Sequence, residues 1–130
     1  MIPALSAFIK GIGARGDAGI LVADPDKKSA CKRSNLFLRW MVRKDSVDPG
    51  GWEKIPKSAL VIPLDTHMFR VGTLLGFTSR KQANLLTALE ITRGFRELSP
   101  EDPVRYDFCL TRFGIREEMS PEDLKIMLEK

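Results

Sequence analysis

Residue types that commonly hold metals and disulfides are scarce in this sequence of 130 residues. It has one histidine, His67, and two cysteines, Cys31 and Cys109, which stand far apart rather than in a C-x-x-C pair. Structural zinc sites combine about four such ligands at short spacing, so we expect no metal and no other cofactor. We also expect both thiols to be reduced, and nothing in the local sequence supports a Cys-His nucleophile pair.

Long hydrophobic runs are also missing. The longest apolar stretches, such as residues 59–63, are far too short to span a membrane. The N-terminus has no positive region before its apolar residues and is a poor secretory signal, so we expect a cytoplasmic protein with no membrane partner. A net charge of +4 and a pI near 9.3 are compatible with a polyanionic partner.

No stretch alternates apolar and polar residues for long enough to predict a β-strand, whereas helical spacing recurs along the chain. We therefore expect one all-α domain over residues 1–130, with five to seven helices. The first three expected helices cover Pro3 to Lys10, Ala30 to Arg43 with Ser29 as cap, and Thr66 to Leu75. The next is capped by Thr78 or Ser79 and runs to Leu98, either whole or broken into two helices. Two more begin at S-P-E-D motifs: one runs from S-P-E-D-P at 99–103 to Gly114, and the last follows the second S-P-E-D at 120–123.

The stretch I-P-L-D-T-H, residues 62–67, is the most informative one in the chain. Pro63 disfavours helix for the residue before it, so a helix should start with Asp65 as its N-cap and stop at Gly76. A carboxylate held at a helix N-terminus is either an ordinary cap or a catalytic group. His67 either bonds a backbone carbonyl, caps a neighbouring helix or transfers protons.

The helix expected over residues 30–43 carries four polar residues at intervals of three, four and four, which puts them on one face. They are Lys32, Asn35, Arg39 and Arg43. This face is either a narrow solvated stripe on a buried helix or a cationic seam for a phosphate backbone. A partly desolvated lysine loses its proton more readily and becomes an amine nucleophile, so Lys32 with Asp65 is a candidate catalytic pair.

The glycine motif near the N-terminus and the loop that holds Trp52 each have two possible interpretations. Gly11, Gly13 and Gly16 spell G-x-G-x-x-G, but helix-like residues precede them, which disfavours a dinucleotide site. They form either the hairpin of a helix-hairpin-helix or a flexible insertion. The loop from Lys44 to Pro56 holds Trp52, which either pins the loop to the core or stacks on nucleic-acid bases.

Two resemblances add to this interpretation. The runs S-A-C-K-R-S-N-L-F-L-R-W-M-V-R-K-D-S-V-D-P-G-G-W, I-P-L-D-T-H, T-A-L-E-I-T and P-E-D-P-V-R-Y-D-F-C-L-T-R-F-G-I resemble an uncharacterised bacterial family, a domain of unknown function, over Asp24 to Ile115. More distantly, L-D-T-H-M-F-R-V-G-T-L-L-G is similar to the V-D-T-H-x-x-R-V-x-x-R-L-G stretch of helix-hairpin-helix base-excision DNA glycosylases, the endonuclease III and 8-oxoguanine glycosylase group.

The second resemblance implies a site. The catalytic aspartate of that motif falls on Asp65, and the lysine that forms a Schiff base in bifunctional members falls on Lys32, within a K-x-x-x-x-F-L-R pattern. The L-P-G-V-G hairpin and the iron–sulfur cysteines of that group are absent. Members of the uncharacterised family generally have a further N-terminal helical half. That implies either the C-terminal part of a larger protein or a naturally shortened one, and in both cases the uncovered apolar faces favour self-association.

The leading hypothesis is a DNA-repair-type glycosylase or lyase domain acting on damaged or abasic DNA, with Lys32 as nucleophile and Asp65 as catalytic carboxylate. The alternative is a non-catalytic nucleic-acid-binding or assembly module. In a third, purely structural hypothesis, these motifs are only helix caps and core residues. The residues expected to contact nucleic acid are Arg33, Asn35, Arg39, Arg43, His67 and Arg70.

Overall fold

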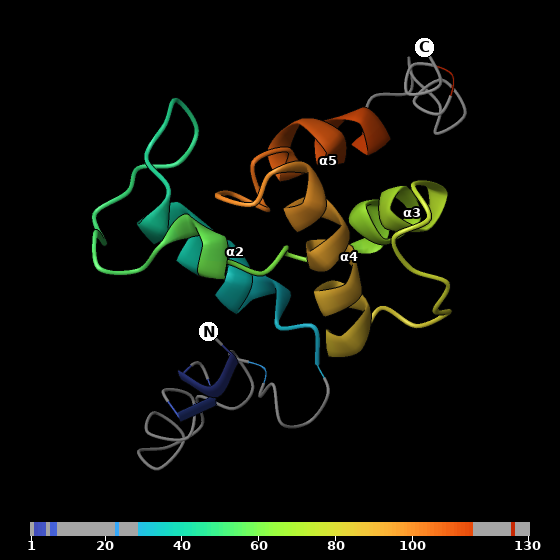
Figure 1. Ribbon diagram of the computed structural model, residues 1–130, viewed down its shortest axis with the longest axis horizontal. Coiled ribbons are helices and arrows are strands. Elements are labelled where there is room, and N and C mark those ends of the chain that lie inside the picture. Colours follow the sequence, from blue (N-terminus) through green and yellow to red (C-terminus); the bar gives the residue numbers. More distant parts are fainter. Residues whose placement is uncertain (1, 5, 8–22, 24–28, 116–125, 127–130) are drawn as a thin grey trace.

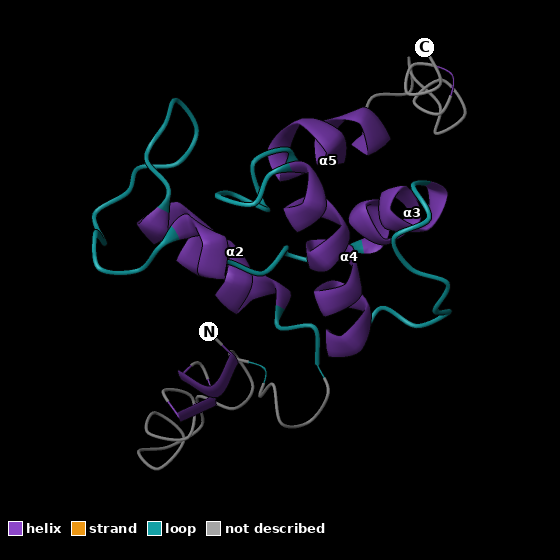
Figure 2. Cartoon of the chain, in the orientation of Figure 1, coloured by secondary structure: helices purple, strands orange, loops and turns teal. Residues whose placement is uncertain are grey.

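The computed structural model describes residues 2–4, 6–7, 23, 29–115 and 126 (Figure 1). Between residues 29 and 115 it holds four α-helices and one short 3-10 helix, with no strand beyond an isolated bridge between Lys44 and Pro49 (Figure 2). The all-α expectation is confirmed for this part of the chain. The G-x-G-x-x-G motif and the second S-P-E-D lie outside the described residues. Within them, no helix is long and apolar enough to cross a membrane.

Helix α2, Lys32–Val42, begins two residues later than expected. Cys31 adopts a left-handed conformation with φ 51°, which breaks any helix before it. Ser29 is therefore not the N-cap; its Oγ instead accepts a hydrogen bond from the Cys31 backbone N–H at 3.2 Å. The consequence for the site is that Lys32 is the first residue of the helix.

Helix α3, Thr66–Leu74, starts where the sequence predicts. Asp65 is its N-cap, and Oδ1 accepts a hydrogen bond from the Met68 N–H at 2.7 Å. Gly76, with φ 74°, ends it. The extended segment before it is buried, and the Ile62 N–H donates to Thr92 Oγ1 at 3.0 Å, which fixes this segment against α4. The start of α3 is thereby held from both sides of Asp65.

Helix α4, Leu85–Leu98, is one unbroken helix that is capped by Asn84, not by Thr78 or Ser79. The Thr78 hydroxyl is used elsewhere, because it donates to Glu90 Oε2 at 2.7 Å. Helix α3 packs against α4 and α5, and Figure 1 shows α4 running between α2 and α3. Small residues allow this close packing: a Cβ on Gly72 would lie 2.5 Å from Ile91 Cδ1.

Helix α5, Asp107–Ile115, starts later than the S-P-E-D-P motif predicts. Residues 99–106 instead form successive turns, in which the N–H of Asp102 bonds Ser99 O and the N–H of Arg105 bonds Asp102 O. Val104 is completely buried, and Asp102 is paired with Arg43, the residue that follows α2. These tertiary contacts hold the turns against the core and delay the helix.

Candidate functional site

The N-termini of α2 and α3 meet at Lys32 and Asp65. Lys32 Nζ lies 3.7 Å from Asp65 Oδ2, within ion-pair distance. The Lys32 side chain is 50% exposed and that of Asp65 17%, so the amine is accessible while the carboxylate is held. The two oxygens of Asp65 divide their roles, because Oδ1 caps α3 and Oδ2 faces the lysine. Two residues that are distant in sequence thus form one site at the surface.

Arg39 and Arg43 lie elsewhere, and the expectation that they share an exposed stripe with Lys32 is wrong. Arg39 is 3% exposed and Arg43 7%. Buried guanidinium groups require carboxylate partners, and α2 obtains them from the following loop, the 99–106 turns and α5. Contacts join Arg39 to Asp48 and Asp107, and Arg43 to Asp45, Asp48 and Asp102. Their guanidinium groups are occupied within the protein rather than presented to a phosphate.

Asp107 connects this buried network to the candidate site. Burial raises the pKa of its carboxyl from 3.8 to about 6, although the positive charge of Arg39 opposes the shift and the negative charge of Asp65 adds to it. Thr111 Oγ1 lies 3.3 Å from Asp107 Oδ1. Asp107, Asp48 and Asp102 were not identified from the sequence. Arginines at helical spacing among the apolar Leu38 and Val42 were the available signal that carboxylates would be needed.

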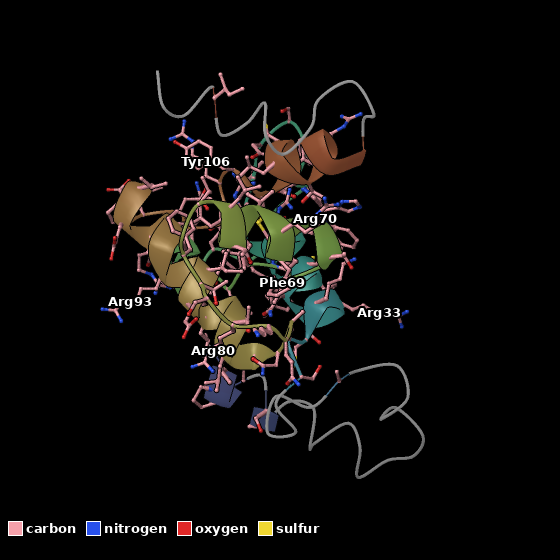
Figure 3. All side chains as sticks on the ribbon, turned by 90° about the vertical axis from the view of Figure 1, so that its right-hand side faces the viewer. Arg33, Phe69, Arg70, Arg80, Arg93 and Tyr106 are labelled. Atoms are coloured by element: carbon pink, nitrogen blue, oxygen red, sulfur yellow. The ribbon has the colours of Figure 1, made fainter. Side chains whose placement is uncertain are left out.

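The other expected contact residues divide into buried and exposed ones. Asn35 is 1% exposed, and its Nδ2 donates to Ala30 O at 3.1 Å, so it belongs to the helix start rather than to a surface. His67 is half-buried. Arg33 and Arg70 are exposed, the first on α2 and the second on α3 (Figure 3). Neither forms an ion pair within the part of the chain that is described.

Two clefts formed by the described residues lie away from the Lys32–Asp65 pair. One, of about 760 Å³, is formed by the end of α2, the 3-10 helix Lys57–Ala59 and the 99–106 turns. A shallower one, of about 460 Å³, lies along residues 51–55. Lys32 and Asp65 line neither of these two clefts. Among the described residues, no group of three or more His, Cys, Asp or Glu is arranged to hold a metal ion.

Comparison with known proteins identifies a family but no characterised relative. Neither the curated proteins nor the solved structures contain a match. Residues 1–116 match a family described as a protein of unknown function, DUF2400. This match covers most of the chain and includes α2 through α5. The protein therefore belongs to the DUF2400 family of proteins of unknown function.

Proposed function

We propose that this protein acts on abasic or damaged DNA as a glycosylase or lyase, with Lys32 as the amine nucleophile and Asp65 as its proton acceptor. The observation that supports the proposal is the 3.7 Å separation of Lys32 Nζ and Asp65 Oδ2 at an accessible position. The two residues to which the glycosylase resemblance assigns the chemistry are thus neighbours in space, although 32 residues separate them in the chain.

The chemistry requires an uncharged amine. A proton passes from the Lys32 ammonium to Asp65 Oδ2, and the free Nζ attacks C1′ of the sugar. At an abasic site, which presents an aldehyde, the N–C1′ bond forms and the carbonyl oxygen leaves as water, giving an imine. At a damaged nucleotide, the bond between C1′ and the base breaks as the N–C1′ bond forms. The base leaves with the electron pair and takes up a proton.

The charges around the pair suit a nucleic-acid strand. Arg33 follows Lys32 on α2, and Arg70 lies one turn into α3 beyond Asp65. Both guanidinium groups are exposed, so each can contact a phosphate. Arg39 and Arg43 contribute no phosphate contact, since their buried ion pairs hold the scaffold together.

The alternative is a nucleic-acid-binding or assembly module without catalysis. The observation that favours it is that Lys32 and Asp65 line neither of the two clefts found among the described residues, because enzymes that act on one nucleotide generally enclose it in a pocket. A capping aspartate with a nearby lysine also stabilises a helix start without any chemistry.

Borohydride trapping separates these functions. An imine between Lys32 and an abasic oligonucleotide is reduced by borohydride to a stable amine, so we expect a covalent adduct with the wild type and none with Lys32→Ala. Lys81→Ala is the matched control, because Lys81 is an exposed lysine in a loop before α4. Equal trapping of both variants would contradict the assignment of Lys32. Salt-dependent binding without any adduct would favour the alternative, and no binding at all would contradict both catalysis and nucleic-acid binding.

A further inference from the structure

The side of α2 that faces away from the core carries large aromatic residues. The helix buries Asn35, Leu38, Arg39 and Val42. Its opposite side presents Arg33, Phe37 and Trp40, spaced by four and three residues as on one helical face. Phe37 is 47% exposed and Trp40 43%. Exposed aromatic residues grouped on one face indicate a binding surface more strongly than scattered ones do.

The loop after α2 adds a third ring to this surface. It folds back on the helix through backbone hydrogen bonds of 2.8 Å from Gly50 N to Trp40 O and from Trp52 N to Met41 O. The Trp52 ring lies edge-on to Phe37, with ring centroids 5.7 Å apart and an interplanar angle of 84°. Trp52 nevertheless stays 41% exposed. The loop therefore fixes the ring without burying it, and we call Phe37, Trp40 and Trp52 the aromatic face.

The exposed charges on α2 and in the loop that holds Trp52 are mostly positive. Arg33, Lys44 and Lys54 are exposed, and none forms an ion pair within the described part of the chain. Asp45 offers little free negative charge, since its carboxylate accepts two backbone N–H bonds and contacts the Arg43 guanidinium at 3.0 Å. Glu53 is the remaining exposed carboxylate of this loop.

This combination fits one class of partner. Positive groups beside exposed rings are the arrangement that binds single-stranded nucleic acid, in which bases stack on aromatic rings and phosphates contact cations. A second copy of this chain fits less well, because a symmetric interface would bring the same lysines and arginine toward each other. A base-paired duplex also fits less well, since its bases are stacked on one another and are not free to stack on Trp40 or Trp52.

We propose that the aromatic face is a stacking platform for unpaired bases of a nucleic-acid strand, with Arg33, Lys44 and Lys54 contacting its phosphates. The inference rests on the proposed function only in taking a nucleic acid as the partner. The surface lies close enough to serve the same strand as the Lys32 site. At a helical rise of about 1.5 Å per residue, Trp40 is about 12 Å along α2 from Lys32, which corresponds to about three to four nucleotides at B-form spacing.

Intrinsic fluorescence provides a direct test, because the chain has two tryptophans, Trp40 and Trp52, and both belong to the aromatic face. The probe is an undamaged single-stranded oligothymidylate, titrated into the full chain. Stacking on the rings should quench the emission. A duplex of the same length should quench it less and bind more weakly. An unchanged emission in the presence of the single strand would overturn the proposal, as would equal binding of the duplex.

Variants identify the ring that carries the binding. Fluorescence anisotropy of a labelled oligothymidylate should show affinity reduced by about 5- to 150-fold in Trp52→Ala, the range for loss of one base–aromatic stack. Trp52→Phe keeps a ring and should retain most of the affinity, and circular dichroism checks that both variants fold. Leu98→Ala is the matched control, because Leu98 is an exposed apolar residue on α4, 63% accessible. A similar loss in Leu98→Ala would overturn the assignment.

Two further results keep this inference distinct from the proposed function. Lys32→Ala should abolish borohydride trapping and still bind the undamaged strand. A wild-type protein that binds the strand and gives no trapped adduct would overturn the proposed catalysis alone. Trapping that survives in Trp52→Ala together with unchanged strand affinity would overturn the stacking platform alone. Sedimentation measures the oligomeric state, and a dimer that dissociates in Trp40→Ala would assign the aromatic face to self-association instead.

Discussion

Asp65 has two oxygens in two roles, and substitution can separate them. Asn accepts the same capping hydrogen bond as Asp, so Asp65→Asn should keep the bond to the Met68 N–H and lose only the charge that faces Lys32. The ion pair itself is worth little, because the Lys32 side chain is 50% exposed. We therefore expect Asp65→Asn to unfold within about 0.5 kcal/mol of the wild type.

Asp65→Ala removes the cap as well and should cost about 1 kcal/mol. For a chain of 130 residues, an unfolding entropy of about 2.1 cal/mol/K per residue converts this loss into a Tm lower by about 4 °C. Circular dichroism at 222 nm during thermal and urea unfolding measures both variants. If Asp65→Asn were as unstable as Asp65→Ala, the charge rather than the cap would stabilise α3, and our reasoning on the two oxygens would be refuted.

The same pair of variants tests the chemistry. Neither side chain can accept the lysine proton, so both should lose borohydride trapping to a similar degree, by about 100-fold or more for a missing general base. We therefore expect Asp65→Asn to keep nearly the wild-type stability and yet to lose borohydride trapping. Trapping that remains at the wild-type level in Asp65→Asn would mean that Asp65 is a structural cap, and the proton acceptor would have to be sought elsewhere.

Two further predictions concern the scaffold. A Cβ at position 94 would lie 2.3 Å from Phe77 Cγ. We therefore expect Gly94→Ala to lower the free energy of unfolding, measured in urea, by about 1–2 kcal/mol, although alanine has a better helix propensity than glycine. A more stable variant would contradict this packing. The pKa of Asp107 is raised from 3.8 to about 6, so the stability that its protonated form contributes is present below pH 3.8 and lost as the pH rises through 6. The wild type should lose up to about 3 kcal/mol relative to Asp107→Asn over that range, and a pH-independent difference in unfolding free energy would contradict the shift.

Local signals predicted a good part of the fold. The bend at Pro63, the capping aspartate and Gly76 delimit α3 almost to the residue, because these effects act within one helical turn. Where a local capping signal competed with a contact to a residue distant in the sequence, the prediction from the local signal was wrong. Thr78 and Ser79 are good capping residues, yet α4 starts at Asn84 because Thr78 is bonded to Glu90, a partner that spacing alone does not reveal.

The charged stripe of α2 shows the same limit more sharply. Helical periodicity predicts Lys32, Arg39 and Arg43 on one side of a helix, and Arg43 in fact follows α2 as its C-cap residue. Periodicity also carries no information about what covers that side. Carboxylates from the following loop, the 99–106 turns and α5 cover the two arginines and bury them, while the lysine at the helix start stays exposed.

The sequence alone determined the helical class, the capping role of Asp65 and the position of Lys32 near a helix start. Each of these depends on residues within a few positions of one another. The tertiary structure alone decided that Lys32 meets Asp65, that Arg39 and Arg43 are interior, and that Trp52 returns to lie beside Phe37. These are contacts between separate segments, set by how the helices and loops pack together. The periodicity of a single helix does not encode them.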